Sequence, residues 1–180
     1  SGKGVDSVSR QTNQTYYLES TCVANDKRFQ FLINERGPKV IKARSYKKFN
    51  LELIELYQLE DKEPYEVRIT QAGCTDQSLN MDFNFKDKIK SFSALIEKLK
   101  NALNDLPFED NTISVRKEFI NVLSKLERKP KKLCKVDINF VAYAKRTLCS
   151  TKVNGLYYQL LWGDMKDGKR IINLSSASTY

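Results

Sequence analysis

Residues 79–106 read LNMDFNFKDKIKSFSALIEKLKNALNDL, and the spacing of their apolar residues changes partway along. Over residues 79–85 apolar and polar residues alternate, which predicts a strand with one buried face. Over residues 89–106 the apolar residues recur every three or four positions, as on one side of an amphipathic helix, and Asp87 is placed to cap the first turn. This change of period predicts a strand followed by a long helix.

The segments before this stretch follow the period of strands. Alternating apolar residues predict four strands there. They span residues 29–33, 40–45, 49–59 and 65–69. The third breaks its alternation midway, which indicates either a bulge or a short helix, and we favour the bulged strand. The second places Lys42 and Arg44 on one face.

The segments after it contain a second helix and then further strands. Apolar residues at helical spacing run from Val115 to Leu126, and Pro130 ends the helix. Alternation then predicts four more strands. They span residues 136–142, 145–153, 156–163 and 170–174. Asn154-Gly155 is a strong signal for a tight hairpin turn, so these strands are expected to form a meander.

Strands, then two helices, then strands predict an α+β fold with an antiparallel sheet. The order of elements in the first part is similar to that of a pleckstrin-homology-like barrel, in which about six strands are closed by a helix. We expect flexible tails at residues 1–14 and 175–180 and a single α+β domain over residues 15–174. Its two sub-units would be residues 15–107, rich in strands, and residues 108–174, with a basic helix and the meander.

The residue inventory argues against an enzyme. The chain has no histidine, which removes the serine and cysteine triads and most catalytic metal sites, and it has no glycine-rich phosphate loop. Six carboxylates lie close together in sequence and are interpreted as a solvated charged turn. They are Glu52, Glu55, Glu60, Asp61, Glu63 and Glu66. We therefore expect no catalytic residue, cofactor or metal.

The charge is concentrated in one half of the chain. The net charge is +9 in 180 residues, yet residues 1–111 hold 17 basic and 17 acidic residues, whereas residues 112–180 hold 14 basic and 5 acidic ones. This asymmetry predicts an acidic partner, either a nucleic acid or an acidic protein, for the C-terminal half. The candidate binding residues are Arg116, Lys117, Arg128, Lys129, Lys131, Lys132, Lys135, Lys145 and Arg146. A second basic cluster comprises Lys39, Lys42, Arg44, Lys47 and Lys48.

Aromatic residues in the same half are candidates for stacking on bases. They are Tyr143, Tyr157, Tyr158 and Trp162. Core packing is the alternative for Trp162 and for one of the hairpin tyrosines.

Two functional classes follow. The first is an intracellular adaptor whose basic C-terminal half binds an acidic partner, and residues 128–132 resemble a short nuclear-import signal. The second is a secreted or cell-surface recognition domain, because the four cysteines at 22, 74, 134 and 149 allow two disulfides in three connectivities. A protein partner is expected in either class, and no apolar run is long enough to span a membrane.

Overall fold

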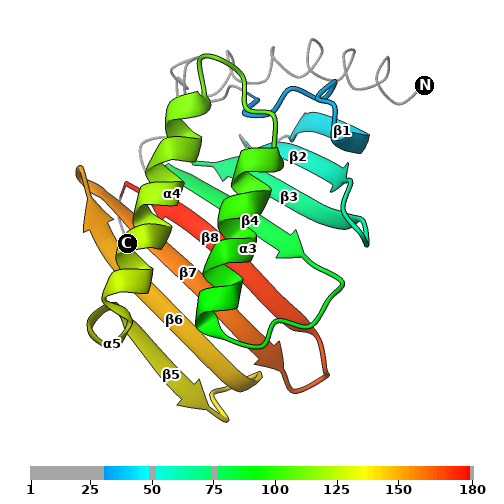
Figure 1. The fold of residues 1–180 in the computed structure, drawn as a ribbon. Helices are drawn as coiled ribbons and strands as arrows, with labels where there is room; N and C mark the ends of the chain where they lie inside the picture. The colour runs from blue at the N-terminus through cyan, green and yellow to red at the C-terminus, as the bar shows by residue number, and fades with distance from the viewer. Residues whose placement is uncertain (1–30, 49–51, 74–76, 179–180) are drawn as a thin grey trace.

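The computed structural model describes residues 31–48, 52–73 and 77–178. Eight strands form one antiparallel sheet in the order β1-β2-β3-β4-β8-β7-β6-β5 (Figure 1). They are β1 (Val40–Lys48), β2 (Glu52–Leu59), β3 (Tyr65–Ala72), β4 (Ser78–Asn84), β5 (Cys134–Ile138), β6 (Tyr143–Val153), β7 (Leu156–Met165) and β8 (Arg170–Ala177). The predicted α+β class is confirmed.

The sheet is open, so the closed barrel is not formed. Each half of the chain makes a four-stranded meander, and the two meanders join where β4 pairs with β8. This pairing uses the free side of β4 that a closing strand would need, and it leaves β1 and β5 at opposite edges of the sheet. The C-terminal meander therefore extends the first sheet.

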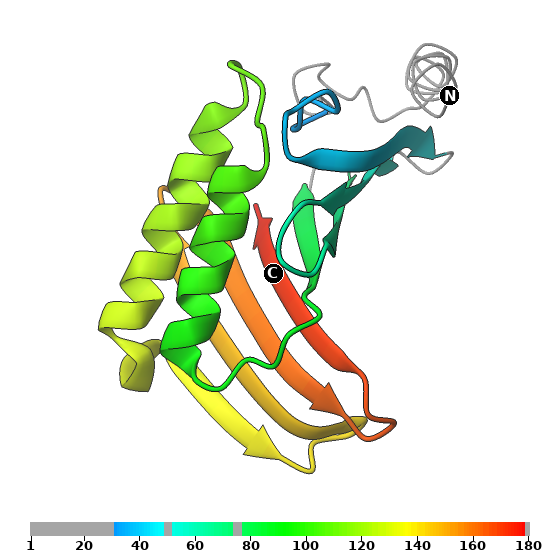
Figure 2. The same ribbon diagram turned by 45° about the vertical axis from the view of Figure 1, so that its right-hand side comes forward.

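The two long helices, α3 (Phe92–Asp105) and α4 (Ile113–Arg128), cover one face of the sheet (Figure 2). Ser91 caps α3 by accepting a hydrogen bond from the Ala94 amide, so the prediction of Asp87 as the cap is wrong. Asp87 instead forms an ion pair with Lys98. Pro130 does not merely end α4, because it also begins the single-turn helix α5 (Pro130–Leu133).

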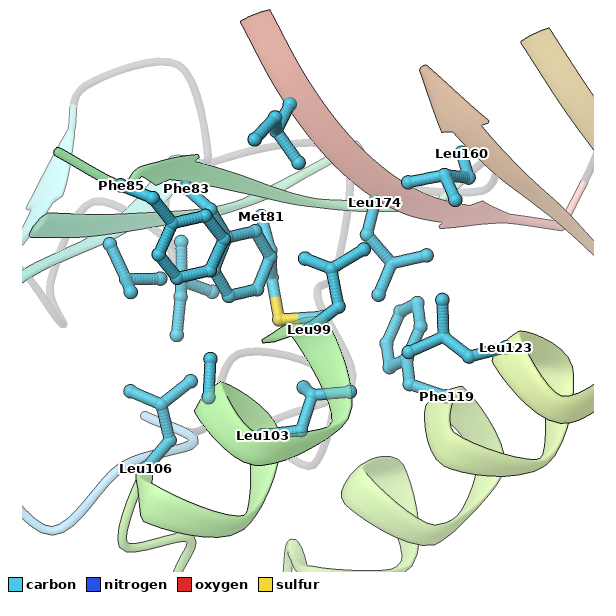
Figure 3. Close-up of a cluster of buried hydrophobic side chains, with 14 of the residues drawn as sticks. Met81, Phe83, Phe85, Leu99, Leu103, Leu106, Phe119, Leu123, Leu160 and Leu174 are labelled. Carbon is cyan, nitrogen blue, oxygen red and sulfur yellow. The ribbon is translucent and has the colours of Figure 1, made fainter. Parts of the chain in front are cut away.

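The core lies between the helices and the sheet, where the alternating residues of the strands meet the apolar stripes of the helices. Met81 and Phe83 of β4 face Leu99 of α3, and Leu174 of β8 lies near Phe119 of α4 (Figure 3). All of these side chains are at least 97% buried. Residues 79–106 therefore form a strand followed by a helix, as the change of period predicts, and the two pack against each other.

Residues 31–36 do not continue the strand predicted over residues 29–33. Leu32 and Ile33 are both buried, which strand alternation would not allow, and Ile33 forms only an isolated bridge with Phe108. The Asn34 amide donates to the Pro107 carbonyl, so this segment is joined to the α3–α4 connection. Phe29 lies outside the described residues.

Three other predictions along the strands differ from the structure. The strand predicted over residues 136–142 ends at Ile138, because the chain turns into the β5–β6 connection there. Strand β2 pairs with β3 in continuous register from Leu53 to Leu59, and the irregularity lies in β1, between Val40 and Lys42. Strand β8 extends to Ala177, so residues 175–177 are not a tail. Residues 1–14 and residues 49–51 lie outside the described part of the chain. The Asn154-Gly155 hairpin is confirmed, with φ angles of 51° and 80°.

Candidate binding surfaces

Five predicted cations lie together where α4 ends, α5 turns and β5 begins. We call this surface the basic corner, and it comprises Arg128, Lys129, Lys131, Lys132 and Lys135. All five side chains are exposed, because Pro130 ends α4 and the short α5 has no buried residue. Within the described residues none of the five has an ion-pair partner.

Arg116 does not belong to this surface. Its Nε donates to the Leu103 carbonyl at 2.8 Å, and its Nη2 donates to the Leu106 carbonyl. The guanidinium also lies 5.1 Å from the centre of the Phe108 ring. Because these carbonyls are at the end of α3, Arg116 holds α3 and α4 together, and burial lowers its pKa.

Lys117 is exposed, but it lies in the first turns of α4 whereas Arg128 ends that helix. Eleven residues of helix separate the two by roughly 16 Å. The cations predicted as one continuous face are therefore divided along α4.

Arg146 is held by neighbouring side chains on β5 and the β5–β6 connection. It donates to Asp137 at 2.9 Å, and its guanidinium lies 3.7 Å from the centre of the Phe140 ring. Lys145 is exposed and lies opposite Ile138 in the β5–β6 register. Of the two cations predicted on β6, only Lys145 is therefore available to a partner.

The aromatic residues expected to stack on bases do not gather at the basic corner. Tyr158 is 2% exposed, packs edge-on against Phe119, and donates to Glu118 at 3.0 Å. Trp162 packs against the core, which confirms core packing, the alternative to base stacking for this residue. Tyr157 lies 5.0 Å from the Lys152 ammonium near the hairpin turn. These positions weaken the case for base stacking beside the basic corner.

Burial of two tyrosines predicts a loss of stability at alkaline pH. Burial raises the pKa of Tyr65 and of Tyr158, and the Glu118 carboxylate adds to the shift at Tyr158. The folded state therefore keeps these protons at a pH where the unfolded chain loses them, so stability is unchanged below about pH 10 and falls above it. We expect Tyr158→Phe to reduce this fall, as measured by urea unfolding across that range. An equally steep fall in the variant would contradict the assignment.

The second basic cluster is also divided by the structure. Lys42 and Arg44 are exposed on the sheet face opposite the helices, where they line an open cavity of about 680 Å³. Lys39 forms an ion pair with Asp105 at 3.2 Å. Lys47 opposes Leu53, and Lys48 ends β1 opposite Glu52. Only two of the five cations therefore share one site.

The cavity carries both signs of charge. Arg68 and Arg170 bring the lining cations to four, but the Arg170 guanidinium is held by the backbone carbonyls of Phe85 and Asp87. Glu66 and Asp82 line the same space, together with apolar side chains. Interspersed charges produce a weaker net field than a surface of one sign. This cavity is consequently expected to attract an acidic partner less strongly than the basic corner does.

The sequence did not identify Glu55 as a buried, hydrogen-bonded carboxylate. It was grouped with solvated carboxylates, yet it is fully buried on β2. Its carboxylate accepts hydrogen bonds from the amides of Leu32 and Ile33 at 3.0 and 3.2 Å and from the Tyr57 hydroxyl at 2.7 Å. The alternation along the strand could have indicated this burial, because Glu55 lies on the same face as Leu53 and Tyr57.

The cysteines form a disulfide between neighbouring strands. Cys134 of β5 is bonded to Cys149 of β6, at directly paired positions. Cys22 and Cys74 lie outside the described residues. In the described part of the chain, no three cysteine, aspartate or glutamate side chains gather where they could hold a metal ion. Over the same residues, no helix combines the length and apolar composition needed to cross a membrane.

No family model, curated protein or solved structure matches this chain.

Proposed function

We propose that this chain is a non-enzymatic binding domain that binds an acidic partner through the basic corner. The observation that carries the proposal is five exposed cations without an ion-pair partner in the described residues. From Arg128 to Val136 the chain contains no acidic residue, and the next one, Asp137, is neutralised by Arg146. Such a surface attracts anionic ligands and orients them on approach.

An acidic protein fits this surface better than a nucleic acid does. Phosphate contacts by lysine and arginine would suit either ligand. Single-stranded nucleic acids, however, also need aromatic platforms beside the cations, whereas Tyr158 is buried in the core and Trp162 packs against it. We therefore propose a protein segment as the acidic partner.

The test replaces four of the cations by glutamine, in R128Q/K129Q/K131Q/K132Q. The matched control is K62Q/K86Q/K88Q/K90Q, which removes the same charge from exposed positions elsewhere. The probe is a fluorescent oligoglutamate peptide at low salt. We expect the first variant to bind about tenfold more weakly, because four rim charges at roughly 0.3–0.5 kcal/mol each sum to more than 1 kcal/mol.

The control variant should lose much less affinity, since only the net field changes. Equal losses in the two variants would mean that total charge, and not the basic corner, determines binding. Absence of binding at low salt would remove the proposal altogether. If single-stranded DNA binds more tightly than oligoglutamate and depends on the same four residues, the partner is a nucleic acid and the protein assignment is wrong.

The disulfide favours a second candidate, in which the domain recognises a protein receptor or ligand outside the reducing cytosol. Disulfides persist in secreted and surface proteins and are rare in the cytosol and nucleus, and Cys134–Cys149 is formed here. Differential alkylation of the protein from its source cells tests this candidate. Alkylation of both cysteines without prior reduction would support the intracellular adaptor instead.

A further inference from the structure

Strand β5 forms one edge of the sheet. It pairs with β6 on one side, and no described strand pairs with it on the other. An unpaired edge can accept an extended peptide as an additional strand. Whether β5 can do so depends on which backbone groups, side chains and charges it presents there.

Three observations identify the backbone groups that point away from β6. The Cα atoms of Cys134 and Cys149 are 4.0 Å apart, the close spacing of a non-hydrogen-bonded antiparallel pair. The Cys134 amide donates to Pro130, outside the sheet. The Asn139 amide donates to Ala144 across the β5–β6 connection. Since the two kinds of pair alternate, the N–H and C=O groups of Val136 and Ile138 face the open edge.

The same two residues expose apolar side chains. Val136 is 59% exposed and Ile138 is 72% exposed. They lie on the helix side of β5, in phase with Cys134, but beyond the residues that the helices cover. Phe140 and Val141 continue the apolar surface into the β5–β6 connection, at 42% and 75% exposure. An edge protected against pairing would carry charged side chains at these positions.

The opposite side of the same strand carries Lys135, and the strand begins beside the cations of the basic corner. Lys135 alternates with Val136 and so lies on the other side of the pleat. Lys131 and Lys132 precede it on α5, and the only carboxylate of β5, Asp137, is paired with Arg146. With Asp137 paired, the cations at this end of the strand favour an acidic segment as the occupant of the edge.

We infer that the β5 edge binds an extended segment of an acidic partner protein by strand addition. The segment alternates apolar residues, which lie beside Val136 and Ile138, with acidic residues, which lie beside Lys135 and the basic corner. Backbone hydrogen bonds to the two exposed peptide groups supply affinity, and the alternation supplies selectivity. This inference deepens the proposed function and rests on it.

The test uses peptides and a substitution that acts only on the open edge. Two fluorescent peptides of about ten residues share one composition, with valine and glutamate either alternating or in two blocks. Val136→Pro removes the outward amide and leaves the β5–β6 hydrogen bonds intact, because the Val136 amide does not point at β6. Val136→Thr is the matched control, since it keeps the amide and changes the side chain. Urea unfolding verifies that both variants fold.

We expect the alternating peptide to bind about tenfold more tightly than the block peptide, and Val136→Pro to abolish this advantage while Val136→Thr preserves most of it. Equal binding of the two peptides, unchanged by Val136→Pro but lost on removing the cations of the basic corner, would overturn strand addition and leave the proposed function standing. If the parent protein binds neither peptide, both the strand-addition inference and the proposed function are wrong. A dimer that Val136→Pro converts to a monomer would show that the edge is occupied by a second copy, which also overturns the inference.

Discussion

Glu55→Ala is expected to lower the free energy of unfolding by at least roughly 3 kcal/mol, because it leaves three buried donors without this acceptor and each costs about 1–3 kcal/mol. The carboxylate accepts from two backbone amides and one tyrosine hydroxyl, and it is fully buried. The two amides belong to Leu32 and Ile33, so the interaction joins the segment before β1 to the middle of β2. Equilibrium urea unfolding measures the effect.

Glu66→Ala is the matched control for this prediction. Glu66 is exposed on β3, the strand next to β2, and surface substitutions of this kind usually change stability by less than about 0.5 kcal/mol. Glu55→Gln should give an intermediate loss, because one oxygen remains an acceptor while the new amide group faces a donor. If Glu55→Ala proves as stable as Glu66→Ala, the hydrogen bonds of this carboxylate do not stabilise the fold.

Removing the Cys134–Cys149 disulfide, in the C134A/C149A variant, is expected to lower the free energy of unfolding by about 3 kcal/mol. The cross-link closes a loop with a sequence separation of 15 residues, and closing a loop of this size in the unfolded chain accounts for about that amount. The effect should be largest at β5, which pairs with β6 alone among the described strands. Amide hydrogen exchange should therefore show faster exchange in β5 of the variant than in β8.

A reductant provides the control for the disulfide. It should destabilise the parent protein more than it destabilises the C134A/C149A variant, which lacks this cross-link. A variant with the stability of the parent would show that the β5–β6 pairing needs no cross-link. Because the β5 edge also carries the inferred strand-addition site, reduction should weaken binding of the alternating peptide in parallel with the loss of β5 protection.

The basic corner was accessible to sequence interpretation because its exposure follows from local rules. Proline at 130 interrupts α4, and the residues on either side of it are almost all charged. The exposure of cations next to a helix end can be predicted from the local sequence, without knowing which distant residues pack nearby. Arg116 and Arg146 are also arginines in the basic half of the chain. Each, however, is held by a group from another element, Arg116 by the Leu106 carbonyl and Arg146 by the Phe140 ring. No local pattern distinguishes an available arginine from one that is held.

Glu55 illustrates the same limit for carboxylates. Most of the carboxylates near it in sequence are exposed, beginning at Glu60, so composition groups Glu55 with them. Its burial depends on the backbone of Leu32 and Ile33, more than 20 residues away. The alternation with Leu53 and Tyr57 indicated the correct face of β2, but a charge on an apolar face becomes tolerable only when the donors are known.

The sequence by itself determined the main elements and the charge. Alternating apolar residues predicted all eight strands in whole or in part, helical spacing predicted α3 and α4, and Asn154-Gly155 predicted a hairpin. Only the tertiary structure decided that β4 pairs with β8, which makes an open sheet with β5 at its edge. The physical reason is that periodicity and turn chemistry act between residues close in sequence. Strand pairing across 90 or more residues depends on which faces bury the most apolar surface together.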